Sequence, residues 1–264
     1  MLEIKNVYKT FNPGTINEKK ALNGLNLTLN DGDFVTVIGG NGAGKSTMLN
    51  MIAGVYPVDS GAIIIDGTEV TKLPEHKRAK YLGRVFQDPM MGTAADMWIE
   101  ENMALAARRG QRRGLKWAIN KHEREQFKKM LSELDLGLEN RLSAKVGLLS
   151  GGQRQALTLL MAVMKKPKLL LLDEHTAALD PKTAAKVLEL SDNFIAEEGL
   201  TAMMVTHNMR DAIAHGNRLI MMNNGKIILD VSGEEKKKLT VEYLLEAFSK
   251  LSGEEFANDR ALLN

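Results

Sequence analysis

The sequence predicts an α/β fold, in which a mostly parallel β-sheet is flanked by helices and the chain is interrupted by an all-helical insert. Three observations lead to this prediction. An apolar run at 34–38 leads through a glycine-rich loop into a helical pattern. Short apolar runs alternate with helical segments after residue 168, whereas residues 90–164 show helical spacing alone. Alternating strands and helices are typical of a parallel sheet that is covered on its faces.

The overall composition is that of a globular protein. The 264 residues are 44% apolar and 26% charged, which is ordinary for a folded domain with a substantial core. The formal charge of +2 gives no field that favours nucleic acid, and the absence of cysteine excludes disulfides and thiol chemistry. No apolar run is long enough to cross a bilayer, and the N-terminus lacks the apolar stretch of a signal peptide. We therefore expect a cytoplasmic protein.

The expected elements follow from periodicity. Leu2–Val7 and Leu25–Leu29 partly alternate apolar and polar residues, as half-buried antiparallel strands do. Further strands are expected at 34–38, 61–67, 82–86, 169–172, 202–206 and 219–222. Helices are expected after residue 47 and at 98–109, 122–134, 151–164, 182–198, 209–214 and 241–251. The last helix is amphipathic, and its pattern favours packing against the core over a regulatory role.

The first functional motif is the loop that follows the strand at 34–38. Its sequence, GGNGAGKST, fits the phosphate-binding pattern GxxxxGK[ST] between a strand and a helix. The glycines let backbone amides point at phosphate oxygens, Lys45 can reach the β- and γ-phosphates, and Ser46 can offer its hydroxyl to Mg²⁺. The alternative is a glycine-rich turn without a ligand. The residues expected around the phosphates are Gly39, Asn41, Gly42, Ala43, Gly44, Lys45, Ser46 and Thr47.

Two carboxylates end the apolar strand at 169–172. Asp173 would hold Mg²⁺ through the water shell of the ion, and Glu174 would polarise the water that attacks the nucleotide. The alternative is an ordinary strand that is followed by a polar turn.

A third motif identifies a family. Leu149–Gln153, with the sequence LSGGQ, directly precedes a helix, where it could form an anion site or a plain helix cap. Together with the phosphate loop, it makes the chain resemble the ATP-binding subunits of ABC transporters from Leu2 to Asp230, with LSGGQ as their signature motif. The resemblance implies a P-loop NTPase core, an antiparallel β subdomain and an inserted helical subdomain. The expected limits within the single domain, 1–264, are 1–89 and 165–235 for the core, 90–164 for the helical subdomain and 236–264 for a tail.

The resemblance also assigns roles around the nucleotide. Gln87 would contact the Mg²⁺ region and relay the state of the nucleotide to the helical subdomain. His207 would contact the γ-phosphate and, with Glu174, orient the attacking water. Phe11 would stack on the adenine, with Tyr8 as the weaker candidate, and Thr47 would lie on the α-phosphate side.

Further residues are assigned to a partner subunit's site. Ser150, Gly151, Gly152 and Gln153 would complete the nucleotide site of a partner in a head-to-tail dimer, and Asp180 would face that partner. One departure is visible, because the family usually has proline after the Asp–Glu pair and this chain has His175. Proline would fix the backbone φ there, whereas histidine adds a titratable group.

The resemblance implies an ATPase that uses ATP and Mg²⁺ and pairs with a second copy of itself or a homologous subunit. The helical subdomain would dock on an integral-membrane permease at the inner face of the membrane, in a system that includes a substrate-binding protein and no nucleic acid. The expected role is uptake of amino acids or similar small nutrients. A soluble ATPase of iron–sulfur assembly, and an ATPase for export or lipoprotein release, remain alternatives.

Two other features of the sequence give little information about function. A basic run contains Arg108, Arg109, Arg112, Arg113, Lys116, Lys121, Arg124, Lys128 and Lys129, with Trp117 inside it. It could be a solvated face of the helical insert, a surface for acidic lipid or a membrane partner, or a nucleic-acid site, and the first is the simplest interpretation. The five histidines show no spacing typical of metal ligands.

Overall fold

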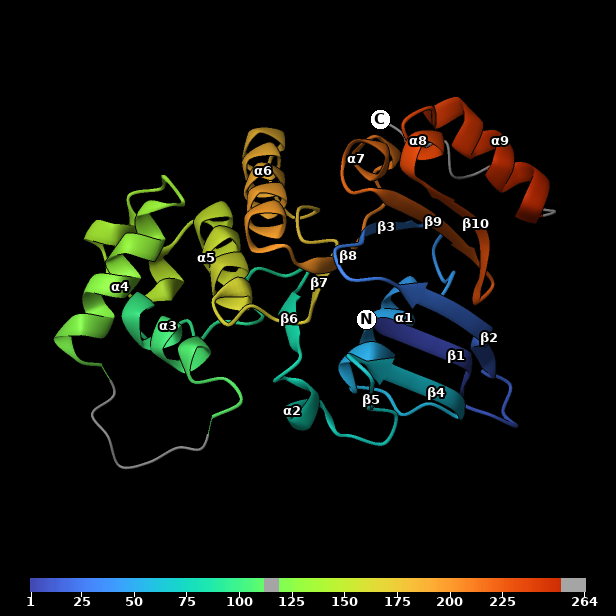
Figure 1. Ribbon diagram of the computed structural model, residues 1–264, viewed down its shortest axis with the longest axis horizontal. Coiled ribbons are helices and arrows are strands. Elements are labelled where there is room, and N and C mark those ends of the chain that lie inside the picture. Colours follow the sequence, from blue (N-terminus) through green and yellow to red (C-terminus); the bar gives the residue numbers. More distant parts are fainter. Residues whose placement is uncertain (112–118, 253–264) are drawn as a thin grey trace. The chain divides into compact units, whose positions relative to one another are not determined.

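The computed structural model describes residues 1–111 and 119–252 (Figure 1). The chain forms two compact units. The first unit contains Met1–Arg78 and the described residues from Thr201 onward, and the second unit contains Ala79–Leu200.

An antiparallel sheet opens the first unit, with the strand order β2-β1-β4-β5. Its strands are β1 (Leu2–Phe11), β2 (Lys19–Leu29), β4 (Ser60–Ile65) and β5 (Thr68–Glu69). Leu2 pairs with Leu29 on one side and with Ile65 on the other, and all three side chains are buried. The expected antiparallel strands are therefore confirmed. Both are longer than predicted, because hydrogen bonds carry β1 to Phe11 and start β2 at Lys19, beyond the apolar alternation.

The parallel strands of this unit surround β3 (Phe34–Ile38), which lies between β8 (Thr201–Val205) and β9 (Arg218–Asn223). Every residue of β3 and β8 is buried, as expected of strands that are covered on both faces. An antiparallel edge strand, β10 (Lys226–Ser232), pairs with β9. The sequence does not predict this strand, since Lys226 and Asp230 interrupt its apolar residues.

Helices complete the first unit. They are α1 (Lys45–Ala53), α2 (Glu75–Arg78), α7 (Met209–Ala214), α8 (Gly233–Lys236) and α9 (Val241–Ser252). The amphipathic pattern of α9 is confirmed as a packing face, because Leu244 and Phe248 are buried in a core cluster. Leu245 is 37% exposed, so the apolar stripe is only partly covered.

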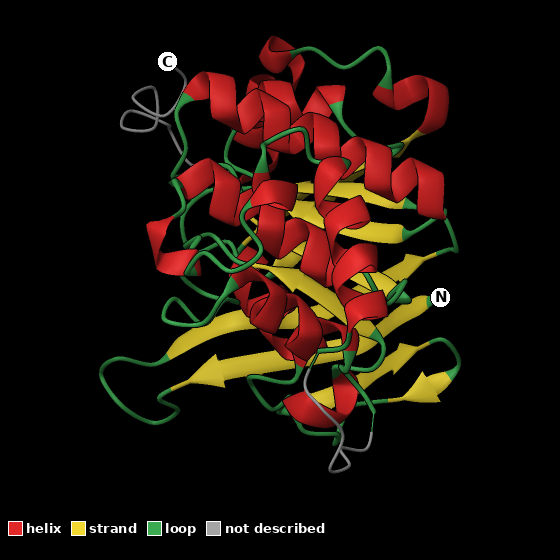
Figure 2. Ribbon diagram, turned by 90° about the vertical axis from the view of Figure 1, so that its left-hand side faces the viewer, coloured by secondary structure: helices red, strands yellow, loops and turns green. Residues whose placement is uncertain are grey.

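The second unit is mainly helical and contains two parallel strands, β6 (Leu82–Val85) and β7 (Leu169–Asp173). Its helices are α3 (Ile99–Ala107), α4 (Lys121–Ser132), α5 (Gly151–Val163) and α6 (Pro181–Glu198), with 3₁₀ turns η1 (Leu138–Asn140) and η2 (Val146–Leu148). In the described part of 90–164 no strand occurs, as predicted. Helix ends differ from the prediction by one or two residues, and α3 begins after Trp98 because the Glu101 carboxylate accepts the Trp98 amide, 2.7 Å away. Figure 2 shows the helices and strands by type.

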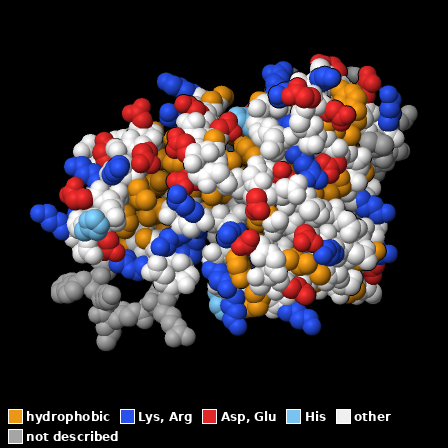
Figure 3. Space-filling view, viewed as in Figure 1, with side chains coloured by type: hydrophobic (Ala, Val, Ile, Leu, Met, Phe, Trp, Pro, Cys, Tyr) orange, Lys and Arg blue, Asp and Glu red, His pale blue; other side chains and the backbone are white. Residues whose placement is uncertain are grey.

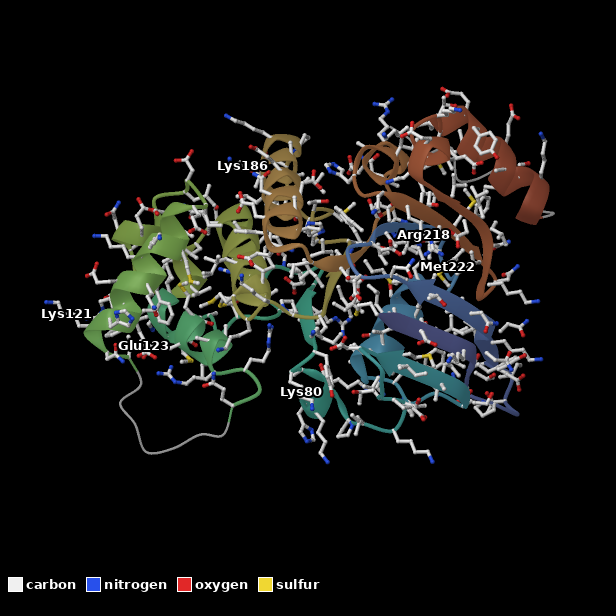
Figure 4. The ribbon with its side chains drawn as sticks, viewed as in Figure 1. Lys80, Lys121, Glu123, Lys186, Arg218 and Met222 are labelled. Atoms are coloured by element: carbon white, nitrogen blue, oxygen red, sulfur yellow. The ribbon has the colours of Figure 1, made fainter. Side chains whose placement is uncertain are left out.

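Three arginines of the basic run make ion pairs or hydrogen bonds within the second unit. The Arg124 guanidinium forms an ion pair with the buried Glu100 carboxylate, with a nearest distance of 2.6 Å. Arg108 pairs with Glu123 at 3.0 Å, and Arg109 donates to the Ala162 carbonyl. Lys121 points away from the unit (Figure 4). Arg124 nevertheless stays exposed and Arg108 and Arg109 are half-buried, so the interpretation of a solvated face stays a prediction. Arg112, Arg113, Lys116 and Trp117 lie outside the described residues.

The surface mixes both signs of charge. Figure 3 shows lysine and arginine side chains interspersed with aspartate and glutamate over the visible face. This agrees with the formal charge of +2. Within 1–111 and 119–252, none of the helices has the length and apolarity needed to span a membrane.

Candidate functional site

The glycine-rich loop lies between β3 and α1 in the first unit, as the sequence predicts. Gly39 and Gly44 have φ values of +151° and +103°, in the range that favours glycine. A β-carbon would also not fit there, because it would lie 2.3 Å from the Met222 carbonyl oxygen at Gly39 and 2.6 Å from the Ala21 carbonyl oxygen at Gly44. Met222 is on β9 (Figure 4). The loop therefore lies against the backbones of β9 and β2, and Gly39 and Gly44 are required by geometry.

Lys45, the first residue of α1, is oriented by the loop itself. Its side chain is 95% buried, and its ammonium donates to the carbonyls of Gly39 at 2.7 Å and Gly40 at 3.2 Å. The chain thus stores a positive charge inside the loop, at the N-terminus of a helix whose dipole also favours an anion. Asn41, Gly42 and Ser46 are exposed, Ala43 is buried and Thr47 is half-buried. The arrangement can bind a chain of phosphates.

Phe11 lies at the end of β1, half-buried, with its ring edge to face against Tyr56 at a centroid distance of 5.3 Å. Its register partner on β2 is Lys19, whose Nζ lies 2.9 Å from the position that a β-carbon on Gly42 would take. The Lys19 side chain therefore reaches from the register position opposite Phe11 to the phosphate loop. Sequence reasoning missed Tyr56 and Lys19, and neither belongs to a recognisable motif. Tyr8, the alternative to Phe11, directs its hydroxyl toward Gly24.

His207 follows β8, the parallel neighbour of β3. Val37 and Val205 are paired, so Gly39 and His207 each lie two residues beyond the pair, at the same edge of the sheet. Asn208 caps α7 by accepting the amides of Arg210 and Asp211. His207 is exposed, and it follows the strand that pairs with β3.

A second pair of parallel strands positions polar residues in the second unit. Val85 on β6 pairs with Leu172 on β7, so Gln87 and Glu174 each lie two residues beyond this pair. Gln87 is exposed and Glu174 is half-buried, with a left-handed φ of +48°. Asp173 lies 3.5 Å from the Arg84 guanidinium. Arg84 is not marked by any sequence motif, and it places a positive charge beside the carboxylate.

His175 has a structural environment. Its side chain is 99% buried, and its Nε2 lies 3.0 Å from the Ser191 Oγ on α6. The Ser191 hydroxyl also donates to the Val187 carbonyl at 2.8 Å. The residue that replaces the family's proline therefore anchors the turn after Glu174 to a helix.

The signature segment starts α5. The Ser150 hydroxyl accepts the Gln153 amide at 3.3 Å, and the Gln153 side chain accepts the Ser150 amide at 3.2 Å, which forms a capping box. Ser150 and Gly151 are exposed, whereas Gly152 is buried against Thr183 of α6. Both interpretations of this motif fit its geometry, because a capped helix N-terminus can also receive an anion.

Two further residues hold the signature helix in place. Gln155 is fully buried and donates to the Phe86 carbonyl at 3.0 Å, one residue before Gln87. The Arg154 guanidinium donates to the carbonyls of Val146, Gly147 and Leu149. Neither role follows from the sequence, since both depend on backbone that is distant along the chain or folded into a 3₁₀ turn.

Asp180 caps α6 and is exposed. Its carboxylate accepts the Thr183 amide at 3.1 Å. Hydrogen bonds from the Thr183 side chain and then from backbone amides lower the pKa of Asp180 below its usual range. Asp180 is therefore ionised at neutral pH.

The donors assigned to Mg²⁺ are of the right chemistry. The Ser46 hydroxyl, the Asp173 carboxylate and the Gln87 amide offer hard oxygen atoms, which Mg²⁺ prefers. Across the described ranges, no group of three or more His, Cys, Asp or Glu side chains forms a metal cluster by itself.

Comparisons with known proteins agree with this geometry. A family model described as ABC transporter matches residues 22–177. The "Tyrosine transport ATP-binding protein" of Clostridioides difficile (strain R20291) is 46% identical over 253 residues, which are 94% of this chain and 98% of that protein. The "Spermidine/putrescine import ATP-binding protein PotA" of Haemophilus influenzae (strain ATCC 51907 / DSM 11121 / KW20 / Rd) is 35% identical over 89% of this chain, which spans 59% of PotA.

A solved structure has the same fold. The ATP-binding cassette MJ0796, in a dimeric post-hydrolysis state bound to ADP and Pi, superimposes with a TM-score of 0.75 and 30% identity. The match covers 88% of this chain and 98% of the cassette. The fold predicted from the sequence is thereby confirmed.

Proposed function

Since this chain belongs to the ABC transporter family, we propose that it powers the uptake of tyrosine or a similar amino acid through a separate membrane permease. As a member of that family, it binds ATP and hydrolyses it. The observation that carries the choice of solute is the identity with the tyrosine transport relative, which extends over nearly the whole of both chains. The amino-acid class predicted from the sequence agrees with that relative's name.

In the proposed reaction, the loop at 39–47 cradles the phosphates and Lys45 neutralises their charge. Glu174 is the general base that polarises the attacking water, and His207 contacts the γ-phosphate and orients that water. Phe11 stacks on the adenine, with its ring already fixed by Tyr56. Mg²⁺ supplies charge neutralisation at the phosphates when it is bound through Ser46, Gln87 and Asp173.

We infer that two copies, or this chain and a homologous subunit, close head to tail around two ATP molecules. The exposed Ser150 and Gly151 at the start of α5 support this inference, because they present a helix N-terminus to a second molecule's phosphates. Asp180, exposed at the N-terminus of α6, contacts the partner in this arrangement. Loss of the γ-phosphate removes the shared ligand, so the interface loosens after hydrolysis.

The membrane partners follow from the proposed role. The helical subdomain docks on the permease at the cytoplasmic face of the membrane, and a substrate-binding protein delivers the solute from outside. The solute then contacts the permease and not this chain. A soluble iron–sulfur assembly ATPase or an export ATPase would use the same catalytic residues with other partners.

The test is recovery of the complete transporter. A tagged Glu174→Gln chain is purified with ATP from detergent-solubilised cells, with a Lys45→Ala chain as the matched control that binds no ATP. The proposal predicts a multi-span membrane protein in stoichiometric amount, recovered with the first variant only. The wild-type complex is then placed in proteoliposomes, where it takes up labelled tyrosine when ATP is on the side of the ATPase. Recovery of soluble partners alone, or ATP-dependent export, would contradict the proposal.

A further inference from the structure

The helix α9 packs directly behind the phosphate loop. Its buried residues, Leu244 and Phe248, share a cluster with Ile38, the last residue of β3 before the loop. The same cluster contains Leu219 and Met221 from β9 and Ala212 from α7. Figure 1 shows α9 beside α7, β9 and β10 within the first unit. The helix therefore contacts β3, which leads into the loop, and α7, which follows His207.

The contact with the loop is made by the Phe248 ring. A β-carbon on Gly40 would lie 3.6 Å from Cζ of Phe248, which is ordinary van der Waals contact. At the preceding residue, the Met222 carbonyl leaves no room for a β-carbon on Gly39. The segment Gly39–Gly40 therefore lies against both a strand backbone and the aromatic ring of Phe248, a residue that is 93% buried.

That segment is the one that orients Lys45. The Lys45 ammonium donates to both the Gly39 and Gly40 carbonyls, so displacement of these residues displaces the ammonium. Packed interiors transmit strain because they have low compressibility. A shift of this segment therefore moves the positive charge that is expected to bind the phosphates.

The helix is also fixed at its own start. The Thr240 hydroxyl accepts the Tyr243 amide at 3.2 Å, and the Thr240 carbonyl accepts the Leu244 amide at 3.1 Å. Leu244 and Phe248 are one turn apart, so both face the cluster from the same side. The neighbouring Tyr243 is 50% exposed and makes no part of this cluster.

We propose that Phe248 is a positioning residue for nucleotide, which holds Gly39–Gly40 and hence the Lys45 ammonium in the geometry that receives the phosphates. This inference rests on the proposed role of the loop and Lys45, and it is independent of which solute is transported. Phe248 acts on the affinity for ATP through the loop, whereas the activation of water is assigned to Glu174 and His207. Removal of Phe248 therefore raises KM and leaves kcat nearly unchanged.

The experiment compares four variants of the full chain, one of which, Tyr243→Ala, truncates an exposed side chain of α9 as a control. Phe248→Ala empties the space behind Gly40, and Phe248→Leu refills most of it. Leu27→Ala truncates a buried side chain on β2, away from α9, as the control for a general loss of stability. Tm, the Kd for MgATP and the steady-state KM and kcat are measured for each.

Phe248→Ala is expected to raise the Kd and KM for ATP about tenfold, which corresponds to about 1.4 kcal/mol of binding free energy, with kcat within about twofold. Phe248→Leu should recover most of the affinity. Leu27→Ala should lower Tm and leave the Kd for MgATP at the wild-type value. Tyr243→Ala should match the wild type in every measurement.

Unchanged Kd in Phe248→Ala, or an equal rise in Kd in Leu27→Ala, would overturn the inference. If Phe248→Ala does not fold, Phe248→Leu is compared with Leu27→Ala instead. Phe248→Leu must then raise the Kd by about twofold to threefold, and Leu27→Ala, at a similar Tm, must not. Failure of the wild-type chain to bind ATP would instead contradict the proposed function, so the two failures are distinguishable.

Discussion

The loop orients the Lys45 ammonium through the carbonyls of Gly39 and Gly40, and this residue can be tested by substitution. Lys45→Ala removes the buried charge and should abolish nucleotide binding. At an ATP concentration about a hundred times its Kd, the wild type gains about 2.7 kcal/mol of stability, and the variant should gain none. The measurement is the Tm with and without MgATP. The matched control is Lys72→Ala, an exposed lysine of the same unit that keeps the full ATP-induced rise.

Single residues also show where prediction from the sequence ends. The motif predicts the loop, Lys45 and Asp173–Glu174 because their spacing is local. The burial of His175 against Ser191, and the contact of Phe11 with Tyr56, depend on residues that are 16 and 45 positions apart along the chain (175 to 191, 11 to 56). No periodicity in the sequence indicates either pair.

The packing of α5 against α6 can be tested by a substitution at Gly152. A β-carbon on Gly152 would lie 2.0 Å from Cγ2 of Thr183, so Gly152→Ala overpacks this contact. We expect a loss of about 1–3 kcal/mol in the free energy of unfolding. Thr183→Ser removes the clashing methyl group and keeps the hydroxyl, so the double variant should recover most of the loss. Chemical denaturation measures both, and a double variant no more stable than Gly152→Ala would contradict this packing.

The start of α6 adds a pH-dependent test. The pKa of Asp180 is lowered, first by the hydrogen bond of the Thr183 side chain and then by backbone amides. Because the folded-state pKa is below the unfolded value, near 3.8, the cap stabilises above that pH and its contribution is lost as the pH falls through the lowered pKa. Asp180→Ala should therefore lower Tm at pH 7 and match the wild type in strong acid. An equal Tm difference at both pH values would show that the charged cap is not the cause.

Elements with strong periodicity are predictable, and edge elements are not. β3, β7, β8 and helices α3 to α7 follow from apolar runs and helical spacing. β10 and β5 carry polar residues, and their pairing with β9 and β4 supplies the hydrogen bonds that define them. α9 is predicted as a packing helix from its stripe, but its contact with Gly40 is visible only in the folded chain.

For the whole molecule, the order of motifs along the chain predicts the fold class, and the fold explains that order. Parallel strands carry the loop and His207 to one sheet edge in the first unit, and Gln87 and Glu174 to one edge in the second. Such pairings are properties of the sheet and cannot be derived from any single motif. The limits predicted for the core and the helical subdomain stay predictions, as do the roles of the individual site residues.

The central claim is that ATP joins two copies of this chain and that hydrolysis, which depends on Glu174, separates them. The most direct measurement is the molar mass of purified Glu174→Gln by light scattering, with MgATP and with MgADP. We expect twice the mass of one chain with MgATP and the mass of one chain with MgADP. A variant that binds ATP yet stays a single chain, or that hydrolyses ATP at the wild-type rate, would contradict it.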